Sequence, residues 1–379
     1  MKFAMISKKV KEVELSGIRK MFEMAGEDTI NLGLGQPDFQ PPEGAIDAYY
    51  QAMRDGHNGY GSTYGLEELR KEIAEDYSKY KSGLTKENVL MHVGATQAFR
   101  VTTESIIEDG DEVLYPEPGF VLYDSQIKLA GGKPVPYPVE QRYGFVPQIE
   151  DLEERRTSKT KAIIVNSPSN PTGGVFPEDE VKKIIEWAEK NDVIIISDEV
   201  YEKMVYEGEH KSFLGDYENV IMINSFSKVF AMTGWRVGYT ITRKDWIEEL
   251  GKVNYYNIAC PPTATQHAVL HALREELEFV ENMTETFRKR RDIIVDRLNS
   301  ISGIDCLKPK GAFYVFPSFD FDLTAKEFAM ELLDEGVIAT PGTAFGPTGE
   351  GHLRFSYANS TKNIEEAMDI IENTVEDLD

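Results

Sequence analysis

Near-continuous runs of Val and Ile recur along the middle of the chain, separated by segments whose apolar residues have helical spacing. Consecutive apolar residues are typical of strands that are buried on both faces of a parallel sheet. Between two of the runs, the segment 177–191 places Val181, Ile184 and Ala188 on one helical face. This alternation predicts an α/β sheet covered on both sides. The expected strands are 88–93, 112–115, 133–139, 161–166, 193–197, 220–225 and 237–242.

The pattern changes beyond about Asn282. A long charged helix is expected to about Ser302, followed by short strands near 304–307 and 312–316, a helix at 324–335, strands near 337–339 and 352–356, and a helix from Thr361. This order predicts a smaller α+β domain. We therefore expect a large domain over 45–282, with 1–44 and 283–379 forming an N-terminal arm and the small domain; the first thirty or so residues are interpreted as an extended arm plus a short helix.

Charge and composition exclude several classes of function. The formal net charge is -24, and an acidic surface repels nucleic-acid phosphates, so nucleic-acid binding is not expected. The longest uncharged stretch, 253–273, contains Pro261 and Pro262 and is not a membrane span. Two cysteines give no disulfide framework or metal-ligand spacing. No signal peptide is expected, and a cytoplasmic protein fits these features.

Polar residues follow several of the expected strands, at the edge where open α/β sheets bind ligands. A turn of small residues, 94–97, precedes a helix and could bind a phosphate through free N–H groups, or could serve only for packing. Asn170 lies in a loop with Pro168, Pro171 and two glycines, either as a turn residue or with its amide aimed at a ligand. Asp198 ends a buried strand, where it requires a partner unless it caps a helix.

Lys228 follows the strand 220–225 and stands among serines and aromatic residues, eight positions before Arg236. A surface lysine is the ordinary alternative, but the apolar surroundings argue against full exposure. A desolvated lysine has a lowered pKa and is a good nucleophile toward carbonyl groups.

Taken in order, these segments resemble the fold-type-I pyridoxal-phosphate enzymes, specifically the class I/II aminotransferases. The resemblance extends from the segment 34–39 to the segment 351–357 and is most specific in Ser227-Lys228 through 233–239. Asn170 and Asp198, 28 residues apart, match a second pair of motifs. The implied fold is a large domain with a mostly parallel seven-stranded sheet plus the smaller α+β domain. The implied cofactor is pyridoxal 5'-phosphate.

The resemblance implies a role for each matching residue. Lys228 would bind the cofactor aldehyde and afterwards transfer the proton of the substrate Cα. Asp198 would pair with the pyridine nitrogen, Tyr201 and Asn170 would hydrogen-bond the phenolic oxygen, and Phe120 would stack on the ring.

The phosphate, by the same resemblance, would bind the N–H groups of Ala95 and Thr96, the hydroxyls of Ser225 and Ser227, and the guanidinium of Arg236. The resemblance does not decide which serine contributes more.

Substrate contacts are implied for residues at both ends of the chain. Arg354 would bind the substrate α-carboxylate through two parallel hydrogen bonds, with Gly35 and Asn170 completing the carboxylate site; a surface ion pair is the alternative for Arg354. Tyr60, five residues before Gly65, matches a tyrosine that reaches the phosphate of the partner subunit, which implies a homodimer.

The expected reaction moves an amino group from an L-amino acid to a 2-oxo acid, most commonly 2-oxoglutarate, by a ping-pong mechanism. The segment 256–262 looks like archaeal and thermophilic relatives that handle aspartate or aromatic donors. Some aspartate-specific relatives carry a lysine where Thr96 or Gln97 stands here, which weakens a dicarboxylate preference. The alternatives are a C–S lyase on the same fold and, more remotely, a non-catalytic pyridoxal-phosphate-binding regulator.

Overall fold

A computed structural model describes residues 7–13, 29–215 and 217–378. Its centre is a seven-stranded sheet in the order β2-β8-β7-β6-β5-β3-β4. Only β8 runs antiparallel to its neighbours, so the sheet is mostly parallel, as predicted. The strands are β2 (Val89–His92), β3 (Glu112–Glu117), β4 (Lys133–Pro138), β5 (Thr160–Asn166), β6 (Ile194–Asp198), β7 (Val220–Ser225) and β8 (Gly238–Ile241).

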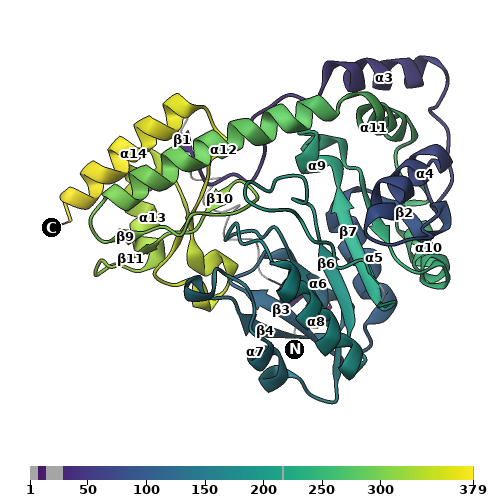
Figure 1. Cartoon of the computed structure of the whole chain (residues 1–379), viewed down its shortest axis with the longest axis horizontal. Helices are drawn as coiled ribbons and strands as arrows, with labels where there is room; N and C mark the ends of the chain where they lie inside the picture. Colours follow the sequence, from purple (N-terminus) through teal and green to yellow (C-terminus); the bar gives the residue numbers. More distant parts are fainter. Residues whose placement is uncertain (1–6, 14–28, 216, 379) are drawn as a thin grey trace, which may run out of the picture.

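Helices bury both faces of this sheet (Figure 1). In β6, Ile194 and Ile196 belong to one apolar cluster and Ile195 to another, because successive side chains point to opposite faces. The first cluster includes α5 (Gly94–Ile106) and α6 (Leu122–Ala130). The second includes α4 (Glu67–Asp76), α8 (Glu178–Asn191) and α11 (Thr263–Glu275). Burial on both faces explains why these strands are continuous Val and Ile runs rather than alternating ones.

A separate apolar cluster lies beneath the C-terminal elements, at the left of Figure 1. The long helix α12 (Leu277–Ser300) leads into it, and α13 (Ala325–Asp334) and α14 (Thr361–Glu376) contribute buried faces. Its strands are short: β1 (Ile30–Asn31) pairs with β12 (Val337–Ile338), β14 (Leu353–Ser356) lies between β10 (Tyr314–Val315) and β13 (Thr340–Pro341), and β9 (Ile304–Asp305) pairs with β11 (Ser318–Phe319). The smaller α+β unit predicted beyond Asn282 is therefore present.

Two details differ from the sequence prediction. Helix α12 begins at Leu277 rather than near Asn282, because Val280 joins Met283 and Phe287 on the buried stripe of the helix. The strands β1, β11 and β13 were not expected, since two residues are too few to establish a period of two.

The expected N-terminal arm is only partly described. Residues 1–6 and 14–28 lie outside the described residues. In the described part of the arm, the helix α1 (Lys8–Lys11) comes before β1. Further helices are α3 (Glu43–Arg54), α7 (Ile149–Arg155), α9 (Phe226–Val229) and α10 (Lys244–Ile258). Among the described helices, none combines the length and the apolar character needed to cross a bilayer.

Candidate active site

A cavity of about 240 Å³ opens beyond the carboxyl ends of β5, β6 and β7, where the sequence predicts a ligand. All the predicted site residues except Tyr60 line it: Gly35, Ala95, Thr96, Phe120, Asn170, Asp198, Tyr201, Ser225, Ser227, Lys228, Arg236 and Arg354. Tyr60 lies elsewhere in the same chain, with 92% of its surface exposed. The fold thus brings together residues that are up to 319 positions apart, from Gly35 to Arg354.

Lys228 lies in the first turn after β7, on the short helix α9. The side chain of Ser225 accepts a hydrogen bond from the Ser227 N–H (3.0 Å), which fixes the start of this turn. The Lys228 ammonium donates to the carbonyl oxygen of Gly35 (2.5 Å). Burial lowers the pKa of Lys228 to about 8, and the positive charges of Arg354 and Arg236 contribute further. Lys228 is therefore poised to supply a neutral, nucleophilic amine near neutral pH.

Asp198 ends β6 and is 4% exposed. The Tyr123 hydroxyl donates to its Oδ2 (2.7 Å) and the Val200 N–H donates to Oδ1 (3.3 Å). Burial raises the pKa of Asp198 to about 6, against the lowering effect of Tyr123. The described residues between β6 and β7, 199–215 and 217–219, form no helix, so Asp198 does not cap one. A buried carboxylate with only two donors suits a cationic partner inside the cavity.

A polar layer surrounds the centre of the cavity. The backbone N–H of Asn170 donates to Oδ1 of Asn166 (2.9 Å). The Nδ2 atom of the same Asn166 amide donates to the Asp198 carbonyl oxygen (3.0 Å). The hydroxyls of Tyr201 and Tyr314 hydrogen-bond each other across 2.9 Å. The sequence did not single out Asn166, Tyr123 or Tyr314. Asn166 ends a strand as Asp198 does, and this shared position was the signal that could have identified it.

The start of helix α5 forms an anion cradle with Arg236. A Cβ at Gly94 would lie 2.5 Å from Nη2 of Arg236, and one at Gly238 would lie 2.8 Å from the Ala95 nitrogen. Glycine at both positions therefore allows the guanidinium and the helix N-terminus to approach closely. Within the described ranges, Arg236 forms no ion pair with a carboxylate; its Nη1 donates to the Thr233 carbonyl (2.8 Å). Free main-chain N–H groups, two serine hydroxyls and an unpaired guanidinium suit a phosphate dianion.

Arg354, on β14, is 1% exposed and also lacks a carboxylate partner among the described residues. Its Nη1 donates to Oδ1 of Asn170 (3.0 Å), and Nη2 contacts the Gly33 carbonyl and the Thr340 hydroxyl. The described residues offer Nε no hydrogen-bond partner. A buried guanidinium is costly unless it is paired with an anion, so this side of the cavity suits a ligand carboxylate. The alternative of a surface ion pair for Arg354 is wrong.

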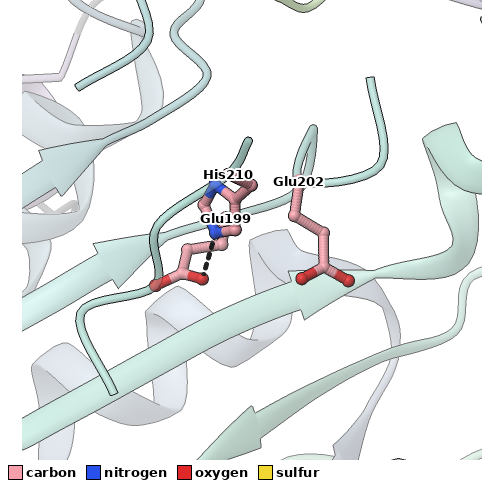
Figure 2. Close-up of side chains that lie close together, drawn as sticks. All are labelled: Glu199, Glu202 and His210. Carbon is pink, nitrogen blue, oxygen red and sulfur yellow. Dashed lines mark hydrogen bonds and ion pairs between the residues drawn. The ribbon is translucent and has the colours of Figure 1, made fainter. Parts of the chain in front are cut away.

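Glu199, the residue after Asp198, does not line this cavity and instead lies in a buried cluster with Glu202 and His210 (Figure 2). His210 Nε2 lies 2.7 Å from Glu199 Oε2, while Oε1 accepts from the Ser212 hydroxyl and the Phe213 N–H, both at 3.0 Å. Both Glu199 oxygens are thus used within the protein. We interpret this cluster as a structural ion pair that holds the segment after β6, and not as a metal site.

Comparisons with known proteins agree with this geometry. A family model described as aminotransferase class I and II matches residues 27–371. The chain is 42% identical over 375 residues to the aspartate aminotransferase of Pyrococcus abyssi, with 96% of each chain covered. It is 39% identical to aromatic-amino-acid aminotransferase 2 of Thermococcus litoralis, with 98% of each covered. The chain belongs to the class I and II aminotransferases. The solved aspartate aminotransferase of Thermus thermophilus with maleate superposes with a TM-score of 0.92 at 34% identity, covering 97% of this chain and 99% of that one.

Enzymes of this family use pyridoxal phosphate to move amino groups, and the residues present fit that cofactor. The cavity carries an anion cradle at one end, a buried carboxylate suited to a protonated ring nitrogen, and Lys228 with a lowered pKa. Two of the predictions made from the sequence are therefore confirmed: the fold class and the transfer of an amino group.

Proposed function

We propose that this enzyme transfers the amino group of aspartate or of an aromatic L-amino acid to a 2-oxo acid, with 2-oxoglutarate as the usual acceptor. The observation that carries the proposal is that the buried, unpaired guanidinium of Arg354 and the amine of Lys228 line one cavity. An α-amino acid brings a carboxylate, which the Arg354 guanidinium would bind, and an amine on the same carbon, which would take the place of the Lys228 amine at the cofactor aldehyde. Relatives named for aspartate and for aromatic donors support the choice of donor.

The proposed roles follow from the groups around the cavity. The bound cofactor supplies an electron sink for the negative charge that develops at the substrate Cα. Lys228 would carry the cofactor and, once released, would move the proton of the substrate Cα to the C4′ carbon of the cofactor. Asp198 holds the proton on the ring nitrogen, because its buried carboxylate is most stable next to a positive charge. Tyr201 and Asn170 donate to the phenolic oxygen of the cofactor, and Phe120 packs on its ring.

The phosphate is assigned to the cradle at the start of α5: Ala95, Thr96, Ser225, Ser227 and Arg236. The substrate α-carboxylate is assigned to Arg354, with Asn170 and the backbone of Gly35 completing its site. In this arrangement the phosphate and the α-carboxylate would bind at separate guanidinium groups, Arg236 and Arg354, and Lys228 lines the same cavity.

We further propose a homodimer in which Tyr60 contacts the phosphate bound by the partner subunit. Tyr60 is 92% exposed and Tyr256 87% exposed, and Tyr255 and Tyr50 also expose more than half of their surface. Large aromatic side chains are seldom exposed to this degree on a monomer, and they are enriched at protein interfaces.

The expected domains are part of the proposal. The C-terminal unit over 283–379, with the N-terminal arm over 1–44, would move against the large domain over 45–282 and exclude water from the bound substrate. The separate apolar cluster under the C-terminal elements supports this division. We also propose a cytoplasmic location, which is consistent with free thiols at Cys260 and Cys306.

A single-turnover experiment tests the function. Purified protein loaded with pyridoxal phosphate is mixed with one amino acid at a time, without any oxo acid, and the cofactor spectrum is recorded. We expect conversion to pyridoxamine phosphate, with one equivalent of the matching 2-oxo acid, fastest for aspartate or an aromatic donor. Accumulation of pyruvate and ammonia with an unchanged cofactor would instead identify a lyase. Sedimentation of the same sample as a monomer would contradict the role of Tyr60.

A further inference from the structure

A buried polar network connects two regions that the proposed function assigns to two different active sites. The first region is the phosphate turn, defined as residues 93–97 at the start of α5. The second is the Tyr60 loop, defined as residues 57–63. Both lie against helix α10, and Asn254 of that helix is fully buried between them. The mechanism above does not use Asn254.

Asn254 uses its whole amide group. Nδ2 donates to the carbonyl oxygens of Thr63 (3.0 Å) and Met91 (3.2 Å). Oδ1 accepts from Nε2 of Gln97 (2.9 Å) and from Nδ1 of His92 (3.1 Å). Since main-chain carbonyls can only accept, the orientation of the amide is unambiguous. One side chain therefore contacts the end of the Tyr60 loop, strand β2 and the phosphate turn.

His92 and Gln97 extend the network to the Val93 N–H at the start of the turn. Gln97 Oε1 accepts from the Val93 N–H (3.0 Å) and from His92 Nδ1 (3.1 Å). Two oxygens face Nδ1 of His92, so Nδ1 carries the proton, and Nε2 accepts from the Thr240 hydroxyl (3.0 Å). Burial lowers the pKa of His92 to about 4, so the ring is neutral at physiological pH. An uncharged and satisfied network in the interior is rigid, because a lost partner would leave a buried polar group unpaired.

The Tyr60 loop is fixed on its other side by the ends of α10 and α11. The Thr63 hydroxyl donates to the Ala259 carbonyl (3.0 Å), and the Thr263 hydroxyl donates to the Gly59 carbonyl (3.1 Å). The position of Tyr60 is therefore set by α10, the same helix that supports the phosphate turn through Asn254.

We propose that Asn254 is a positioning residue that holds the phosphate turn and the Tyr60 loop of one subunit in a single register, so that phosphate affinity at both active sites of the dimer depends on this buried amide. The inference rests on the proposed homodimer and its Tyr60 contact. It also assigns a purpose to Gln97, which supports the turn from beneath instead of contacting substrate.

The test measures how strongly the protein prefers pyridoxal 5'-phosphate over pyridoxal. The preference is expressed as the dissociation constant of pyridoxal divided by that of pyridoxal 5'-phosphate. This ratio reports phosphate binding and is insensitive to a general loss of stability, which weakens both ligands alike. Asn254→Leu removes all four hydrogen bonds of the Asn254 amide at similar volume. Gln97→Met removes the hydrogen bonds of Gln97 to Val93, His92 and Asn254 but keeps those from Asn254 to Thr63 and Met91. Asn257→Leu is the matched control, because Asn257 is exposed one turn later on α10.

We expect the ratio to fall at least about tenfold in Asn254→Leu and in Gln97→Met, because each variant loses hydrogen bonds that orient a site for a charged group. The ratio should stay unchanged in Asn257→Leu. Tyr60→Phe should cost less in the Asn254→Leu background than in the wild type, because the loop is already displaced. A wild-type ratio in folded Asn254→Leu or Gln97→Met, or strictly additive effects of Asn254→Leu and Tyr60→Phe, would overturn the inference. If Asn254→Leu fails to fold, Gln97→Met decides. A monomeric wild type with no preference for the phosphorylated ligand would instead overturn the proposed function itself.

Discussion

Arg354 donates a hydrogen bond of 3.0 Å to the side-chain oxygen of Asn170, which joins β14 to the loop that follows β5. This bond uses the Asn170 oxygen and leaves its amide N–H₂ free of partners among the described residues. It also orients the guanidinium, whose Nε has no hydrogen-bond partner within the described part of the chain. The contact thus connects the proposed cofactor site to the proposed carboxylate site.

Replacing Arg354 should weaken binding of every amino acid donor to a similar extent. Arg354→Ala removes two charge-assisted hydrogen bonds to the carboxylate that all donors share, each worth about 1.5–3 kcal/mol. We expect KM to rise roughly 100-fold for aspartate, aromatic donors and alanine alike. Steady-state kinetics with each donor measures this. Arg297→Ala, at an exposed pair with Asp369, is the control; a loss confined to one donor would contradict the assignment.

Removing the Tyr123 hydroxyl should weaken cofactor binding through Asp198. The hydroxyl donates to Oδ2 at 2.7 Å and lowers the pKa of a carboxyl that burial raises to about 6. In Tyr123→Phe the pKa of Asp198 therefore rises, and the carboxyl becomes neutral over more of the physiological range. We expect the dissociation constant of the cofactor to rise about tenfold. In a plot of activity against pH, the loss of activity on the acid side should move to higher pH. Tyr143→Phe, at an exposed position, should change neither quantity.

The lowered pKa of Lys228 predicts a pH dependence for cofactor loading. Only the neutral amine reacts with an aldehyde, so the rate at which the cofactor-free enzyme takes up pyridoxal should rise with pH and level off above about 8. The positive charge of Arg354 contributes to the lowering, so Arg354→Gln should raise the pKa of Lys228 and move this midpoint to higher pH. Stopped-flow absorbance at a series of pH values follows the reaction. A midpoint near the ordinary value of lysine in the wild-type protein would contradict the prediction.

The sequence predicts this site well where chemistry follows directly from a strand. Asp198 ends β6, and Ser225 to Lys228 follow β7, so a Val and Ile run identifies both the strand and the polar residues at its end. Tyr123 and Tyr314 could not be predicted in this way. Their partners Asp198 and Tyr201 are 75 and 113 positions distant, and Tyr314 lies in a strand of two residues with no period of its own. The first contact depends on how α6 packs against the sheet, and the second on how β10 packs beside the segment after β6; no local pattern encodes either contact.

Gly35 and Tyr314 should show a strong mutual dependence. A Cβ at Gly35 would collide with the Tyr314 hydroxyl, which is hydrogen-bonded to Tyr201 (2.9 Å). Gly35→Ala should therefore displace Tyr314, disturb Tyr201 and lower kcat/KM by about tenfold or more, as expected for overpacking of about 1–3 kcal/mol at a buried position.

Tyr314→Phe removes the obstructing oxygen, although the ring carbon still lies 3.3 Å from the added methyl. The double variant should accordingly recover part of the activity lost in Gly35→Ala, and a double-mutant cycle on kcat/KM gives the coupling. Gly234→Ala, which meets no atom within 4 Å, controls for the added methyl group. Additive losses in the cycle would contradict the predicted coupling, because Gly35→Ala would then act without displacing the Tyr314 hydroxyl.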